Sequence, residues 1–125
     1  MDVQASLDRV AEAPFSGSFG VTVVRAVLAG WLIALMVWLL PSARSARLLT
    51  VLLITYVVAA CNLSHVIAGS VEGLYAVFSG AVGLGDYFFV FLIPTLIGNV
   101  IGGISLVALI NHAAIAPEIT GGDAT

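Results

Sequence analysis

Three long apolar segments dominate the chain, at about 19–40, 48–78 and 87–110. A helix rises ~1.5 Å per residue, so about 20 apolar residues cross a hydrocarbon core of ~30 Å. Each segment is therefore long enough to span a membrane. We expect an all-α integral membrane protein with a transmembrane domain over 19–112, located in the inner (plasma) membrane with the lipid bilayer as its solvent.

Composition excludes several other classes of protein. Hydrophobic residues make up 61% of the chain and charged residues 9%, whereas soluble domains have roughly 25% charged residues. The basic residues are four unclustered arginines and the net charge is −3, so nucleic acid is not an expected partner. The single cysteine, Cys61, excludes an internal disulfide, and no residue cluster indicates a metal or other cofactor. The ends, 1–18 and 113–125, are polar segments, and we expect the C-terminal tail to be frayed.

The middle segment is too long for one span. Its 31 residues would reach roughly 46 Å as a single helix. Its centre carries the only polar cluster in the span, C-N-L-S-H-V-I-A-G-S from Cys61, and Asn, Ser and Gly weaken a helix there. We predict two half-helices, about 48–61 and 65–78, with a break near 62–64. One long tilted helix is the alternative. The sequon Asn62-Leu63-Ser64 lies too deep to be glycosylated.

Small residues and a proline mark the last segment. Gly98 and Gly102 form a G-x-x-x-G pattern, as Gly69 and Gly73 do in the middle segment, and such patterns permit close helix approach. Pro94 is expected to kink its helix, because its ring clashes with the carbonyl four residues earlier.

Arginine placement predicts the orientation. Arg44 and Arg47 lie in the loop 41–47, and the next loop has no positive charge. The positive-inside rule places 41–47 and the C-terminus in the cytoplasm and the N-terminus outside. Such an arrangement is natural for the second half of a six-span protein, so we expect a fragment of one.

His65 is the most informative polar residue. An ionisable group at the centre of a span indicates function by default. A neutral imidazole donates to an anion and, once protonated, passes it a proton; a structural bond to a backbone carbonyl is the alternative. Glu72 lies two turns further along the same face, in an outer vestibule or at the membrane interface.

Two further polar residues have open roles. Asn99 either bonds His65, lines a pore or holds helices together, and Arg25 either attracts anions or extends to the interface. An enzyme is not expected. Ser64 and His65 are adjacent in sequence and point to different helix faces, so they do not form a nucleophile and base.

These motifs resemble the formate/nitrite transporter family. The string F-L-I-P-T-L-I-G-N-V-I-G-G is similar to that family's last-helix motif N-L-I-P-V-T-L-G-N-I-I-G-G, and the broken span with its histidine resembles the interrupted fifth helix containing F-E-H-S-V-A-N. L-I-A-L-M-V-W resembles the end of the fourth helix. The resemblance covers about 19–112 and implies one inverted repeat of an aquaporin-like six-helix fold. It also implies a missing N-terminal half as partner, a homo-oligomer (a pentamer) and small anions as substrates.

The resemblance implies a role for each matching position. His65 becomes the central pore histidine and Asn99 its polar neighbour. The family's glutamate before the histidine is Ser64 here, its paired lysine falls near Pro14, and a phenylalanine of its constriction falls at Val58. Losing both members of an ion pair leaves neither charge uncompensated. We therefore expect a wider, less charged pore entrance.

The predicted function is transport of small monovalent anions or weak acids through a pore with a central histidine. The candidate pore residues are Val58, Asn62, Ser64, His65, Glu72 and Asn99. The alternative is a non-transporting helical membrane interaction module, or an incomplete fragment lacking its own pore. The sequence does not distinguish a channel from a proton-coupled transporter.

Overall fold

The computed structural model describes residues 3–121, with the side chains of residue 3 and of 5–113. Every regular element in that range is helical, which confirms the all-helical expectation. In chain order the elements are α1 (Val3–Glu12), the 3-10 turn η1 (Ala13–Phe15), α2 (Phe19–Ala43), the 3-10 turn η2 (Arg44–Ala46), α3 (Arg47–Ala60), α4 (Val66–Phe78), the single turn α5 (Leu84–Asp86), the π-helical segment η3 (Tyr87–Leu92) and α6 (Ile93–Gly121).

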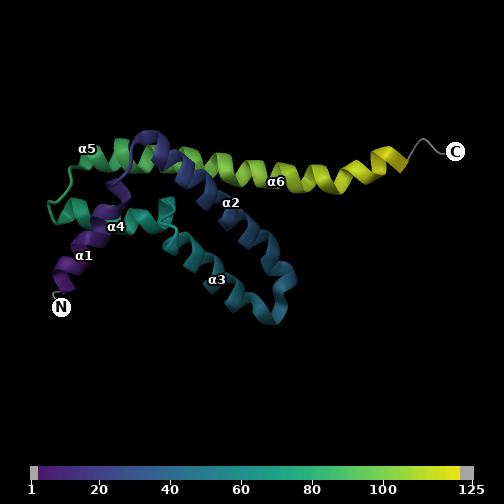
Figure 1. Cartoon of the computed structure of the whole chain (residues 1–125), viewed down its shortest axis with the longest axis horizontal. Coiled ribbons are helices and arrows are strands. Elements are labelled where there is room, and N and C mark those ends of the chain that lie inside the picture. The colour runs from purple at the N-terminus through teal and green to yellow at the C-terminus, as the bar shows by residue number, and fades with distance from the viewer. Residues whose placement is uncertain (1–2, 122–125) are drawn as a thin grey trace.

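Helices α2 and α3 form a hairpin with its tip at η2 (Figure 1). Two helical runs are long and apolar enough to cross a membrane, Phe19–Ala60 and Leu84–Ala113. The first contains two helices, because the backbone reverses near Arg44, whose φ is 39°. Arg47 Nε–H donates to Leu40 O at 3.2 Å, so a carbonyl of the last turn of α2 gains a partner. The first span runs to Ala43, past the expected end at Leu40.

The middle segment is interrupted at its polar cluster, as predicted from the sequence. Helix α3 ends at Ala60, α4 begins at Val66, and residues 61–65 are not helical. At ~1.5 Å per residue, 14 residues of α3 and 13 of α4 each reach only about 20 Å. Neither half alone crosses a ~30 Å core. The alternative of one continuous helix is wrong.

Helices α2 and α6 pack at backbone distance. A Cβ added to Gly98 would meet Val23 O at 2.6 Å, and one added to Gly102 would meet the carbonyl of Val27. On the facing helix, a Cβ on Gly30 would meet the backbone of Asn99. The G-x-x-x-G pattern of the last segment therefore serves the α2–α6 contact, and small residues there let the two backbones approach.

The third segment begins irregularly. Six residues, Tyr87–Leu92, are π-helical and lie immediately before the turn containing Pro94. A π-helical turn is wider than an α-helical one, which gives room for a proline ring that clashes with an ordinary preceding turn. Tyr87 and Phe91 point inward from this segment and are buried.

Both polar ends contain helix. Within the segment 1–18, α1 is an amphipathic helix that packs against α4, with Ala11 buried. At the other end, α6 continues to Gly121, so the backbone of the expected frayed tail is helical over most of 113–125.

Candidate functional site

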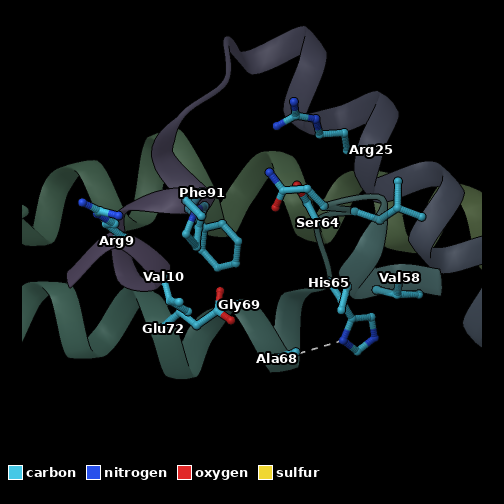
Figure 2. A pocket seen from close by; sticks show the side chains of 15 residues that line it. Arg9, Val10, Arg25, Val58, Ser64, His65, Ala68, Gly69, Glu72 and Phe91 are labelled. Carbon is cyan, nitrogen blue, oxygen red and sulfur yellow. Dashed lines mark hydrogen bonds between the residues drawn. The ribbon is translucent and has the colours of Figure 1, made fainter. Parts of the chain in front are cut away.

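A cavity of about 480 Å³ lies beside the interruption, bounded by α1, α2, the end of α3 and the start of α4 (Figure 2). Five of the six residues predicted for a pore line it: Val58, Asn62, Ser64, His65 and Glu72. Phe91 of η3 closes one side, where its ring faces Gly69 so tightly that an added Cβ would lie 2.5 Å from the ring. The structure thus brings these predicted residues to one space.

Backbone hydrogen bonds cap the C-terminal end of α3. Cys61 N–H donates to Val57 O, Asn62 N–H to Ala59 O, and Leu63 N–H to Val58 O, at 2.9–3.0 Å. This arrangement satisfies carbonyls that a helix end leaves without partners. It places Asn62 at a φ of 50°, in the left-handed region that asparagine tolerates better than most residues.

Asn99 holds the interruption in place. Its Oδ1 accepts from Val66 N–H at 2.9 Å, and its Nδ2 donates to Ser64 O at 3.0 Å and to Ala26 O at 2.9 Å. One amide on α6 therefore ties together α2, the non-helical segment and the first residue of α4. Its bonds go to backbone groups and not to His65, and Asn99 does not line the cavity. These hydrogen bonds match the role that holds helices together, and Asn99 also lines a second groove.

His65 is the N-cap of α4. Its Nδ1 accepts from Ala68 N–H in a long bond of 3.5 Å (Figure 2). Because Nδ1 is the acceptor, the proton of the neutral ring is assigned to Nε2. His65 also lines a second, shallower groove of about 330 Å³, together with Gly30, Ala34, Asn99 and Gly103 among others. The histidine is therefore shared by a polar cavity and an apolar groove.

Three charged side chains line the cavity: Arg9 of α1, Arg25 of α2 and Glu72 of α4. Among the described residues none of the three has a hydrogen bond or an ion pair. The expectation of a less charged pore entrance stays a prediction, but this cavity does carry charged side chains. The charges come from positions that the family motif does not include, so comparing motifs did not find them.

Sequence reasoning missed Arg9. The signal was present, since Val3, Leu7, Val10 and Ala11 repeat with the spacing of one helix face. That pattern predicts an amphipathic helix, which would place Arg9 beside its apolar face, at the edge of the contact with the rest of the protein.

In the described part of the chain, no three His, Cys, Asp or Glu side chains gather at a possible metal site.

Comparison with protein-family models matches residues 1–113 to the formate/nitrite transporter model. The chain belongs to the formate/nitrite transporter family. This family consists of transporters and not enzymes, and the apolar helices agree with a membrane location.

Two relatives match most of the chain. Inner membrane protein YfdC of Escherichia coli (strain K12) is 41% identical over 95 residues, which cover 76% of this chain and 31% of YfdC. Uncharacterized transporter YrhG of Bacillus subtilis (strain 168) is 35% identical over 107 residues, covering 84% of this chain and 40% of YrhG. The matches thus span less than half the length of these relatives. No solved structure matches the chain.

Proposed function

We propose that the chain lines a membrane pathway for small monovalent anions or their weak acids, and that this pathway passes His65. The observation that carries the proposal is the position of His65 at the helix interruption, where it borders both the cavity and the groove. Broken helices at membrane depth occur where the freed backbone is covered by protein or lines a path.

The electrostatics of the cavity favour an anion. Arg9 and Arg25 contribute two positive charges against the one negative charge of Glu72. The N-terminus of α4, at Val66, is the positive end of a helix dipole and attracts negative charge. An anion entering the cavity therefore moves toward His65.

At His65 the anion meets a donor. With Nδ1 accepting from Ala68 N–H, the ring presents Nε2–H. A protonated ring passes that proton to the anion. The neutral acid then avoids much of the cost of moving an ion through a medium of low dielectric constant. Formate and nitrite are the probes that the family suggests.

We propose that loop 41–47 and the C-terminus are cytoplasmic, so that the cavity belongs to the outer half of the membrane and the groove to the inner half. Arg44 and Arg47, which lie in or beside η2, carry this orientation through the positive-inside rule. We also propose that further helices of the same fold and a homo-oligomer, pentameric by family resemblance, complete the pathway. One inverted repeat of an aquaporin-like fold supplies one wall of it.

The test is uptake of labelled formate and nitrite by proteoliposomes. The chain is reconstituted together with the part of YfdC that the match does not cover. His65→Asn keeps an N-cap acceptor but does not carry a proton, and the matched control is His112→Asn, at an exposed position of α6.

We expect uptake by the His65 variant to fall at least ~10-fold, in the range that positioned proton donors supply, and uptake by the His112 variant to stay at the wild-type level. Equal uptake by all three proteins would remove His65 from the mechanism. Vesicles that stay impermeable would favour a non-transporting interaction module.

A further inference from the structure

Glu72 has no function in the pathway described so far. It lies on α4 seven residues beyond His65, about 10 Å by helical rise, and both side chains line the same cavity. Figure 2 shows its carboxylate turned into the space between α1 and α4. A carboxylate within a span that has no ion pair or hydrogen bond among the described residues is costly. Such groups mark ion paths and proton relays.

Water is able to connect the two residues. The cavity of about 480 Å³ has room for several molecules, since each occupies roughly 30 Å³ in the liquid. Asn62 and Ser64 also line the cavity and offer hydrogen bonds to such waters. A chain of these waters gives a proton a path across the cavity.

We propose that Glu72 is the outer proton-exchange residue of a relay that ends at His65, and that it couples anion passage to proton uptake. The proposal rests on the proposed function and extends it, because it names the residue that supplies the proton from the outer side.

One proton is transferred to each anion in the following steps. The Glu72 carboxylic acid gives its proton to the cavity water, and a water proton passes to His65 Nδ1. The Ala68 N–H bond to Nδ1 must be released for this step, and at 3.5 Å it is weak. The imidazolium then gives the Nε2 proton to the anion, the neutral acid leaves, and the Glu72 carboxylate takes a new proton from the outer solution. The Nδ1 proton then passes to cavity water and Nε2 takes up a proton from water, which restores the Nε2–H tautomer with no net change in protons.

Arg9 and Arg25 couple anion binding to the protonation of Glu72. The other charged or titratable side chains that line the cavity are Arg9 of α1, Arg25 of α2 and His65. Of the other such groups on the elements that pack against α4, Asp8 and Glu12 of α1 and Tyr87 of η3 do not line the cavity.

Arg9 and Arg25 attract an anion into the cavity. The negative charge of a bound anion disfavours the ionised form of Glu72, so the carboxylate then takes up a proton more readily. Anion binding and protonation therefore reinforce each other, as linkage requires.

The test measures protons and formate separately. Proteoliposomes holding the chain and the complementary part of YfdC carry a trapped pH-sensitive dye, and labelled formate is added outside. Protein-free vesicles give the background of formic acid diffusion. The variants are Glu72→Gln, the conservative Glu72→Asp and the matched control Asp86→Asn. Asp86 is an exposed carboxylate of α5 outside the cavity.

We expect Glu72→Gln to lower formate-driven proton uptake about 10- to 100-fold, in line with other positioned proton-transfer groups, while exchange of labelled formate across the membrane at equal concentrations persists. Glu72→Asp should recover much of the proton uptake, and Asp86→Asn should match the wild type. Equal helix content by circular dichroism checks that the variants are folded. Wild-type proton uptake in Glu72→Gln would overturn the relay and leave the proposed function intact.

Infrared difference spectra of the chain in detergent distinguish failure of the proton relay from failure of the proposed transport function. Addition of formate should produce a carboxylic acid C=O band that is missing in Glu72→Gln and present in Asp86→Asn. If wild-type vesicles transport nothing, the proposed function fails, and this band alone decides whether Glu72 exchanges a proton when an anion binds. Its absence would overturn the relay.

Discussion

The hydrogen bonds of Asn99 lead to a strong prediction about stability. Asn99→Leu keeps the approximate shape of the side chain and removes three bonds at once. Ala26 O lies inside α2 and keeps its intrahelical partner. Val66 N–H and Ser64 O, at the interruption, lose the partner that Asn99 supplied. A buried backbone group without a partner costs ~1–3 kcal/mol; because these two groups are half-buried, the free energy of unfolding should fall by about 1–3 kcal/mol in total.

This magnitude exceeds that of an ordinary contact between helices in a membrane. Hydrogen bonds between transmembrane helices average roughly 0.6 kcal/mol. The matched control is Ser105→Ala on the same helix, which removes the exposed bond from Trp31 Nε1–H to Ser105 Oγ. The assay is a denaturant titration in detergent micelles followed by circular dichroism. If Asn99→Leu loses no more stability than Ser105→Ala, the freed backbone groups have other partners and the reasoning fails.

Other predictions concern helix packing, a buried hydroxyl and anion recruitment. Gly102→Ala should destabilise the chain by ~1–3 kcal/mol, because its methyl group would meet the carbonyl of Val27, whereas Gly103→Ala has open space and should be neutral or stabilising by up to ~1 kcal/mol. Equal melting temperatures for the two variants would contradict the close α2–α6 contact. Thr95→Val should raise stability by about 1 kcal/mol, since the buried Thr95 Oγ1 has no hydrogen-bond partner in the described part of the chain; a lower melting temperature would mean that the hydroxyl is satisfied. Arg25→Gln should raise the KM for formate by roughly 3- to 10-fold, as expected for loss of one charge-assisted contact, and an unchanged KM would show that Arg25 does not face the anion.

Much of the architecture follows from local sequence. The long apolar segments, an interruption near 62–64 and the close approach at Gly98 and Gly102 were all predicted from residue type and spacing. The structure contains each of them, with the interruption at 61–65. These features depend on hydropathy, helix propensity and side-chain size, which are properties of short stretches of chain.

The candidate site was predictable only in part. His65 and Glu72 were identified because they are ionisable residues in an apolar segment. Arg9 was overlooked, because its position beside them depends on α1 folding back onto α4. No local pattern in either segment specifies that contact.

The sequence by itself determined that the chain is helical, that its apolar segments need a lipid environment and that the middle one breaks at its polar centre. Each of these follows from how a few neighbouring residues interact with water, lipid and their own backbone. Only the tertiary structure decided which groups meet across the break. In the folded chain Asn99 forms hydrogen bonds to three backbone segments. Arg9, Arg25 and Glu72 line one cavity. The physical reason is that hydrogen bonds and electrostatic fields depend on distance in space, and helix packing sets that distance between residues far apart in the chain.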